Sequence, residues 1–323
     1  MVRGKVAGAA TRRNAPGSAG AASAMGMLSA RATPKDRAGE AGRVYLLASS
    51  TSCQSRHQTR VMMRAVVHSA VITVGLIVGA ACSGRRATPE AAPAAPSAPA
   101  VTDGSSLLSA MRFKHPQWFR TLAFTANVTL YSTRGAGTNS QWRQQISLPG
   151  KLRIDYLPLS GRSGVLFDGA RVHTFDNGRA IDAQPGVSAQ LLVTADVYVL
   201  SPERATRLLD SLGFDLSKLR RDTWEGQPAY VVGAAAGDTT TTQLWVDTER
   251  LLAVRMIQKE RRGTRDIVTD VRFGKFSDFG GFPVATEVLQ YRDARQVYRE
   301  VRVDVRVNEP IAETVFDPAK WTR

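Results

Sequence analysis

Apolar and polar residues alternate in short runs through the C-terminal two thirds of the chain. The clearest run is 301–307 (VRVDVRV), where valine alternates with charged residues. A period of two is typical of a strand that is buried on one face. The run therefore predicts that one face carries Val301, Val303, Val305 and Val307. Similar runs predict further strands at 122–133, 140–148, 151–157, 164–168, 171–175, 228–234, 241–248, 251–260, 265–276 and 284–292.

Turn residues separate these runs at short intervals. Asp168-Gly169 and Asn177-Gly178 stand between apolar segments, and such pairs favour hairpins because they tolerate positive φ. Strands joined by short turns pair antiparallel, since parallel pairing needs a long crossover. The pattern predicts an antiparallel sheet in one domain spanning 107–323, which is long enough to bury a substantial core.

Helix signals are confined to a few segments. Ser201-Pro202 supplies an N-cap and a proline at the first helical position, and Gly213 supplies a stop, so a helix is expected between them. Weaker patterns favour helices at 105–111 and 116–122. Residues 187–200 (VSAQLLVTADVYVL) are mostly apolar, and we interpret them as a short helix followed by an extended segment.

An export signal precedes this domain. Residues 62–82 (MMRAVVHSAVITVGLIVGAAC) consist of one basic residue, a long apolar run, small residues and a cysteine. A basic start, an apolar run and a small-residue cleavage site are typical of a secretory signal. The segment from 62 to 81 resembles a bacterial lipoprotein signal, in which the next cysteine is acylated and anchors the mature protein. Here that lipid-anchor residue is Cys82.

Two other interpretations of this segment stay open. Gly79 and Ala81 also satisfy an ordinary signal peptidase, which would release the protein. The third interpretation is an uncleaved membrane helix, although crossing a bilayer takes about 20 residues and the run from Ala65 to Ala81 has 17. Signal removal would leave Cys82 as the lone cysteine of the mature chain. Lipidation would explain why an unpaired cysteine is present there. All three interpretations place residues 83–323 outside the cytoplasm.

The segments around the signal lack the pattern of a folded domain. Residues 1–61 hold ten Lys/Arg against two Asp/Glu and show no amphipathic period. We interpret them as a disordered basic leader from an overlong gene model, with translation starting at Met62 or Met63; a basic arm that binds nucleic acid or membrane is the alternative. Residues 82–106 are rich in Pro and Ala and are expected to tether the lipidated Cys82 to the domain. Much of the net charge of +15 lies in the leader, so the modestly basic domain does not indicate nucleic-acid binding.

The domain lacks the residue patterns of common catalytic and metal sites. It has no HExxH and no paired Cys or His spacing. Ser163 in GRSGV departs from the GxSxG pattern because Val165 replaces the second glycine. Asp168 and Asp176 are interpreted as turn residues, and His173 as a solvated or hydrogen-bonded strand residue. The sequence predicts no enzyme, no cofactor and no metal.

Several segments together resemble the LolA/LolB-like superfamily of lipoprotein-localisation carriers and acceptors, which includes outer-membrane lipoprotein-sorting proteins. They are a strand at 122–131, a strand ending at Pro149, and the segments LRIDY (152–156), LFDG (166–169), VHTFD (172–176), QLWVD (243–247) and LLAVRMIQ (251–258). One position departs, because Leu148 stands where the carriers favour a basic residue. The resemblance implies an antiparallel sheet curled into an incomplete, half-open barrel, with a few helices covering the open side and acyl chains held between them.

The resemblance also implies which residues face the ligand. The inward face of the sheet would line a lipid cavity with Phe124, Val128, Trp142, Ile154, Phe167, Leu244, Met256 and Phe273. Leu191, Leu192 and Val193 would form a lid over its mouth. Ordinary core packing is the alternative at each position, because protein interiors are close-packed.

These expectations combine into a function. We expect a monomeric, non-catalytic protein, held by Cys82 at the periplasmic face of the outer membrane, that binds acyl chains of lipid or lipoprotein during sorting or reception. Ser83 after the cysteine favours the outer membrane, by resemblance to lipoproteins that lack aspartate there. The alternative is an envelope-stress sensor or scaffold that uses the same fold to bind a protein partner.

Overall fold

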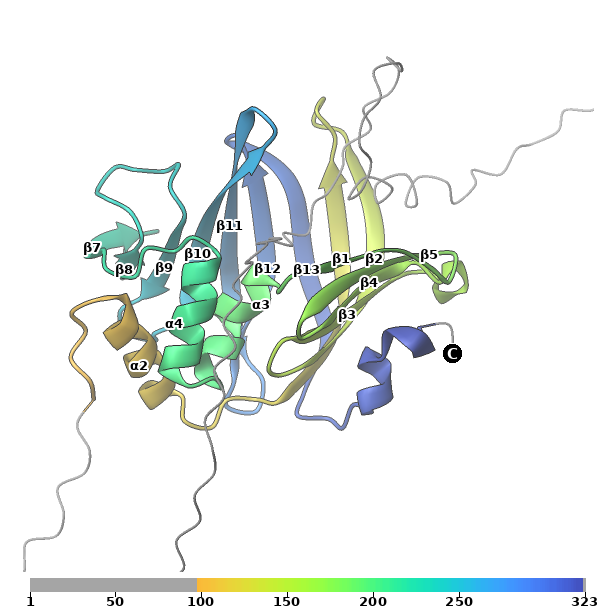
Figure 1. The fold of residues 1–323 in the computed structure, drawn as a ribbon, viewed down its shortest axis with the longest axis horizontal. Coiled ribbons are helices and arrows are strands. Elements are labelled where there is room, and N and C mark those ends of the chain that lie inside the picture. The colour runs from red at the N-terminus through yellow and green to blue at the C-terminus, as the bar shows by residue number, and fades with distance from the viewer. Residues whose placement is uncertain (1–97, 322–323) are drawn as a thin grey trace, which may run out of the picture. The chain divides into compact units, whose positions relative to one another are not determined.

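One long antiparallel sheet, with helices on one of its faces, dominates the computed structural model, which describes residues 98–321 (Figure 1). The predicted basic leader, the predicted export signal, Cys82 and the first part of the expected tether lie outside the described residues. The sheet has thirteen strands in the order β6-β5-β4-β3-β2-β1-β13-β12-β11-β10-β9-β8-β7. Their bounds are β1 Thr121–Tyr131, β2 Gly137–Ser147, β3 Lys151–Tyr156, β4 Gly164–Asp168, β5 Arg171–Asp176, β6 Arg179–Pro185, β7 Leu219–Trp224, β8 Gln227–Val232, β9 Gln243–Asp247, β10 Ala253–Arg262, β11 Arg265–Asp278, β12 Pro283–Arg292 and β13 Arg295–Val307. The predicted mainly β, antiparallel fold class is confirmed.

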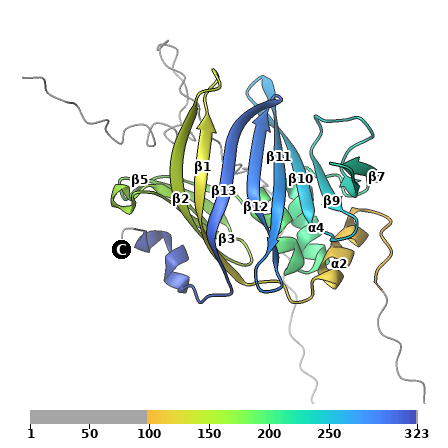
Figure 2. The same cartoon turned by 180° about the vertical axis from the view of Figure 1, so that it is seen from behind.

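The first and last strands pair in the middle of the sheet. β1 bonds to β2 on one side and to β13 on the other, antiparallel in both cases. Two meanders, β1–β6 and β7–β13, are thus joined at this central pairing. The outer strands β6 and β7 do not pair, so the sheet stays open, as predicted. In Figure 1, β3 to β5 run across the direction of β11 to β13, and Figure 2 shows the same bend from behind; long sheets twist and curl in this way.

Helices cover the inner face of the bend. They are α2 Gly104–Lys114, α3 Ala189–Thr194, the 3₁₀ turn η2 Asp196–Tyr198 and α4 Pro202–Ser211. The last three belong to the connection from β6 to β7, and they lie in front of the sheet in Figure 1 and behind it in Figure 2. Within the described residues, no helix is both long and apolar enough to cross a membrane.

The helix predictions are confirmed in two places and wrong in one. Helices form at 104–114 and 202–211, where Asp103 and Ser201 accept hydrogen bonds from backbone N–H groups as N-caps. The expected helix at 116–122 is absent, because those residues form turns before β1 starts at Thr121. Trp118 and Phe119 are buried there as part of the main core, so tertiary packing overrides the local pattern.

The main core fills the space between the inner face and the helices. Leu107 and Met111 of α2, Leu192 of α3 and Leu209 of α4 are almost fully buried and belong to the same cluster as the inward side chains of the strands. Burying a side chain of this size contributes about 1.5–3 kcal/mol. The helices are therefore held to the sheet chiefly by apolar contact.

The alternation in β13 is interrupted, which corrects one prediction. Asp304 has φ of +52°, and opposite it the register with β1 shifts between Ala123 and Thr125. Such a bulge changes which face the following residues occupy. Val305 and Val307 pack against the main core. The expectation that Val301 and Val303 share their face is wrong, because before the bulge the inner face is occupied by polar residues, which are described below.

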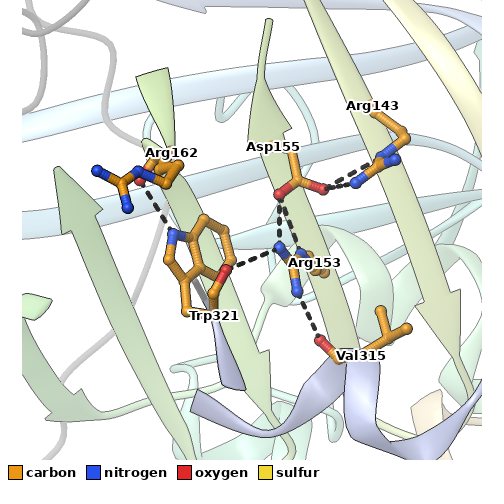
Figure 3. Close-up of polar contacts among 6 residues, drawn as sticks. All are labelled: Arg143, Arg153, Asp155, Arg162, Val315 and Trp321. Atoms are coloured by element: carbon orange, nitrogen blue, oxygen red, sulfur yellow. Dashed lines mark hydrogen bonds and ion pairs between the residues drawn. The ribbon is translucent and has the colours of Figure 1, made fainter. Parts of the chain in front are cut away.

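The C-terminal segment packs on the outer face of β3 to β5 and buries its own small core. It contains the 3₁₀ turns η3 Glu313–Phe316 and η4 Pro318–Lys320. Trp321 stacks on Phe175 with ring centroids 4.2 Å apart and planes within 4°, and its Nε1 donates to the carbonyl oxygen of Arg162 over 3.0 Å. The guanidinium of Arg153 lies 4.2 Å from the Trp321 ring centroid (Figure 3).

A buried carboxylate ties this segment to the sheet. Asp155 is 5% exposed, and its Oδ1 accepts from Nε and Nη2 of Arg153 while its Oδ2 accepts from Nε and Nη2 of Arg143, over 2.9–3.2 Å. Arg153 also donates to the carbonyl oxygens of Val315 and Trp321 (Figure 3). Both carboxylate oxygens of Asp155 and both Nη atoms of Arg153 are thus hydrogen-bonded to other groups of the protein.

Candidate functional site

A pocket opens between the inner face of the sheet and residues 187–200, which we call the cover. Its cavity volume is about 60 Å³. β2, β3, β11, β12 and β13 form its floor and walls, and α3 and η2 of the cover form its roof. Its lining includes Trp118, Phe119, Leu122, Gln144, Ile146, Leu152, Ile154, Ser188, Gln190, Leu191, Thr194, Tyr198, Phe273, Ala285, Tyr298, Glu300 and Arg302.

Aromatic rings form one wall. Trp118 stacks on Tyr198 of the cover with centroids 4.1 Å apart, and Phe119 lies 5.2 Å from Trp118. Phe282 and His115 meet this stack edge-on. His115 is itself fixed, because its Nε2 lies 2.8 Å from the carbonyl oxygen of Arg250. Rings packed in this way give a rigid apolar surface.

Polar side chains occupy the floor, directly before the bulge of β13. Gln144 Nε2 donates to Glu300 Oε2 over 2.8 Å, and the Tyr298 hydroxyl donates to the same oxygen. Arg302 Nε donates to Glu300 Oε1 over 2.7 Å, and its guanidinium lies 4.6 Å from the ring centroid of Phe124. Alternate positions of one strand share a face, so Tyr298, Glu300 and Arg302 all point toward the pocket.

The charges on this floor cancel. Glu300 is 4% exposed and is paired with Arg302, so the carboxylate and the guanidinium neutralise one another. Burial and the adjacent Glu300 charge raise the pKa of Tyr298, which keeps its hydroxyl protonated. The polar part of the pocket therefore carries no net charge at neutral pH.

One carboxylate holds the cover against the sheet. Asp196 of η2 is buried, and its Oδ1 accepts from the backbone N–H of Gly150, in the turn between β2 and β3, over 2.9 Å. Burial raises the pKa of Asp196 to about 7, although the hydrogen bond and the charge of Arg204 oppose that rise. The attachment of the cover thus includes a group that titrates near neutral pH.

Further hydrogen bonds fix the two ends of the cover. Ser188 caps α3 by accepting from the N–H of Leu191, and the hydroxyl of Tyr198 donates to the carbonyl oxygen of Leu251 over 2.9 Å. The expected short helix in this region is present as α3, while the expected extended part forms the 3₁₀ turn η2.

The structure distributes the predicted site residues between pocket and core. Ile154, Phe273 and the lid residue Leu191 line the pocket. All the others belong to the main core and do not line the pocket: Phe124, Val128, Trp142, Phe167, Leu244, Met256, Leu192 and Val193. Cys82 lies outside the described residues.

Sequence reasoning missed the polar floor. The unbroken alternation of 301–307 suggests that Arg302 points outward, whereas the bulge at Asp304 places it inside with Glu300. One available signal was Gln144, which shares the inward parity of Trp142 and Ile146 on β2. A polar residue in an otherwise apolar inward series indicates a buried partner.

The acidic and histidine residues that catalysis could have used serve as turn supports. Asp168 Oδ1 accepts from the N–H groups of Ala170 and Arg171, and its Oδ2 lies 2.8 Å from His173 Nε2. Ser163 donates to Asp176 over 2.8 Å. The interpretation of Asp168 as a turn residue and of His173 as a hydrogen-bonded residue is confirmed. In the described part of the chain, no group of three or more His, Cys, Asp and Glu side chains is placed to hold a metal ion.

Comparison with known proteins finds similar folds but no close relative. No protein-family model matches the chain, and no curated protein matches it. Three crystal structures are similar at 12–14% identity and TM-scores of 0.44–0.48, and each is covered over 98% of its length by 67–68% of this chain. They are a domain assigned to outer membrane lipoprotein sorting from Vibrio parahaemolyticus (12%, 0.47), a LolA superfamily protein from Nitrosomonas europaea (14%, 0.44) and a DUF1329 family protein from Desulfovibrio piger (13%, 0.48). Lipoprotein sorting and the LolA superfamily, which the sequence resembles, are named in two of these three structures.

The pocket has the composition of a small-molecule binding site. Its walls are apolar and aromatic, and its polar groups are bound to one another on the floor. Such an arrangement removes apolar surface of a guest from water while a small number of polar groups fix its orientation.

Proposed function

We propose that this chain is a non-catalytic protein of the cell envelope that binds acyl chains of a lipid or lipoprotein and is held at the periplasmic face of the outer membrane by lipidated Cys82. The observation that carries the proposal is the apolar pocket between an open, bent sheet and a helical cover. The sheet leaves this space because its outer strands do not meet, and the connection between them supplies the roof.

Burial of methylene groups supplies the affinity. Each CH₂ removed from water contributes about 0.8 kcal/mol, so insertion of even part of a chain between Ile154, Phe273 and the aromatic wall yields a useful affinity. Trp118 and Tyr198 present flat ring surfaces, which an extended hydrocarbon can contact along its length.

Filling the pocket tests this proposal. Thr194 lies on the cover, is partly exposed and lines the pocket, so a Thr194→Trp side chain can enter the cavity without displacing the core. We expect the variant to lose most binding of the uncharged dye Nile red and to carry less lipid when purified without detergent. Thr223→Trp, on exposed edge strand β7, is the matched control and should bind like the parent protein. Parent protein that neither carries lipid nor binds the dye would contradict the proposal.

The anchor is tested separately. Cys82→Ser removes the thiol that acylation requires, and we expect the variant to move from the membrane fraction to the soluble periplasmic fraction of cells. Mass spectrometry of the N-terminal peptide of the parent protein should find acylated Cys82 as its first residue. A first residue upstream of Cys82 would refute the proposed anchor and leave the pocket unaffected.

A further inference from the structure

The outer face of β10 to β13, which is turned to the viewer in Figure 2, carries two cations for every carboxylate that binds them. The groups are Asp266 with Lys259 and Arg261, Asp270 with Arg255 and Arg272, and Glu287 with Lys275 and Arg299, all paired over 2.7–3.2 Å. We call these nine residues the basic stripe. It holds three positive charges in excess, and two remain when the exposed Asp304 on β13 is counted against them.

Strand register places the stripe on the face opposite the pocket. The successive partners across β10, β11, β12 and β13 are Arg255, Arg272, Leu289 and Arg299. Residues next to them along the strands belong to the main core or line the pocket, as Glu300 does. Because successive side chains of a strand point to opposite faces, this row points outward. A partner bound here would not contact the cover.

The basic side chains extend farther into solvent than the carboxylates that pair with them. The side chains of Lys275 and Arg299 are 65% and 41% exposed, whereas that of Glu287, to which both are bound, is 13% exposed. The side chain of Arg261 is 66% exposed, against 37% for Asp266. A partner that approaches this face therefore meets ammonium and guanidinium groups before it meets carboxylates.

Aromatic rings lie beside the stripe. The guanidinium carbon of Arg272 is 4.1 Å from the ring centroid of Tyr291 and 5.4 Å from that of Trp224, and both rings are partly exposed. Trp and Tyr are enriched where a membrane meets water, and Lys and Arg are attracted to anionic lipid headgroups. The composition of this face therefore fits an interface with lipid headgroups.

The spread of the charges favours a bilayer over a small anion. Residues 255–261 of β10 extend about 20 Å, and four neighbouring strands are about 14 Å wide. A single phosphate cannot contact charges so far apart, whereas a bilayer presents many phosphates in one plane. The 21 residues from Ser83 to Asp103 can span at most about 70 Å. An anchor at Cys82 would therefore keep the stripe within reach of the membrane.

We propose that the basic stripe docks the domain on a bilayer that contains anionic phospholipids. Headgroup phosphates accept hydrogen bonds from the exposed side chains of Arg261, Lys275 and Arg299. This second binding surface goes beyond the proposed function, because it is separate from the pocket and does not depend on what the pocket binds. It relies on the proposed anchor only for proximity to the membrane.

Sedimentation with vesicles tests the stripe without the anchor. Soluble protein carrying Cys82→Ser is mixed with phosphatidylcholine vesicles that contain either no phosphatidylglycerol or about 30% of it. We expect binding to the anionic vesicles to be about tenfold tighter than to the neutral ones. This preference should be lost when salt is raised from about 50 to about 300 mM, because salt screens exposed charges.

Two results would overturn the proposal. One is Cys82→Ser protein that binds both kinds of vesicle equally or binds neither. The other is protein that ignores the anionic vesicles but is retained by immobilised polyglutamate, which would indicate an acidic protein partner. Nile red binding measured on the same protein reports separately on the pocket, so either result can occur while the proposed function stands.

A triple variant assigns the binding to the stripe. It removes three exposed cations, by Arg261→Gln, Lys275→Gln and Arg299→Gln. We expect it to bind the anionic vesicles about tenfold more weakly. The matched control removes two Arg and one Lys from exposed positions on α2, β6 and α4, by Lys114→Gln, Arg179→Gln and Arg207→Gln. Equal losses in the two triple variants would refute the role of the stripe.

Removing a carboxylate should have the opposite effect. Glu287→Gln leaves Lys275 and Arg299 without their shared counter-charge and adds one positive charge to the face. We expect the anionic vesicles to be bound about three- to fivefold more tightly and the neutral vesicles to be bound as before. A purely structural role for these ion pairs predicts no such gain. Binding that is unchanged or weaker in Glu287→Gln would contradict the proposal.

Discussion

Asp155 and Glu300 are buried to the same extent on opposite faces of one sheet, yet their surroundings differ. On the outer face, Asp155 holds the guanidinium groups of Arg143 and Arg153, and the C-terminal segment covers the cluster and accepts hydrogen bonds from Nη1 and Nη2 of Arg153 (Figure 3). On the inner face, Glu300 is bonded to Arg302 beside an open pocket. The Asp155 cluster is closed by protein groups, which indicates a structural role, whereas the Glu300 cluster borders a pocket that a guest could enter.

Removing the Trp321 side chain, which holds the C-terminal segment against the sheet, should have the largest effect on stability. Trp321→Ala loses the stack on Phe175, the contact with Arg153 and the hydrogen bond to Arg162. We expect the free energy of unfolding to fall by about 3–5 kcal/mol in urea titrations. Trp321→Phe, which keeps the stack, should lose about 1 kcal/mol. Dye binding in the pocket should not change, and a loss of binding in the folded variant would show that the two faces are coupled.

Neutralising each carboxylate compares the two clusters directly. Asp155→Asn should lower the free energy of unfolding by about 3 kcal/mol, because Arg153 is left buried without its counter-charge. Glu300→Gln should lower it by about 1 kcal/mol, since Arg302 borders a pocket that water can enter. Equal losses in the two variants, measured by the same urea titrations, would remove the distinction between a structural and a ligand-facing cluster.

A third buried carboxylate sharpens the contrast by its pH dependence. Asp196 has no guanidinium in contact among the described residues, and its pKa is raised to about 7 from an ordinary value of 3.8. Between these values the folded protein binds more protons than the unfolded chain, so this group makes stability fall as pH rises from about 4 to 7 and has no further effect above. Asp196→Asn, which keeps an acceptor for Gly150, should be more stable than the parent by about 2 kcal/mol at pH 8.

The difference between the Asp196→Asn variant and the parent should shrink below about pH 4 and be small near pH 3, where the parent carboxyl is largely protonated in both states. Thermal unfolding measured across this range checks the sign. A parent protein that becomes more stable between pH 4 and 7, relative to the variant, would contradict the assignment to Asp196.

Most of the strands could be predicted from the sequence, because their period of two follows from burial of one face. The two missed strands are the edges of the sheet. β6 (RAIDAQP) and β7 (LRRDTW) bury little of their surface and so carry no apolar alternation. They are extended only because they pair with a neighbouring strand, and such pairing cannot be recognised in the pattern of a single sequence.

The candidate site was less predictable than the fold. An inward apolar residue in the core and one that lines a pocket have the same sequence pattern. The sequence therefore could not distinguish Phe124 from Ile154, and only the structure places Ile154 at the pocket. The polar floor depends on the bulge at Asp304, which shifts the face of β13 without any glycine to mark it. Local backbone irregularity decided the chemistry of the site.

The pairing of β1 with β13 has a consequence for how the molecule is made. The central hydrogen bonds of the sheet join residues 121–131 to residues 295–307, so they form only after almost the whole domain has been synthesised. Until then β1 presents a long free edge that can recruit other chains. A protein with this order of assembly depends on being kept unfolded, or on being delivered rapidly, until its last strand arrives.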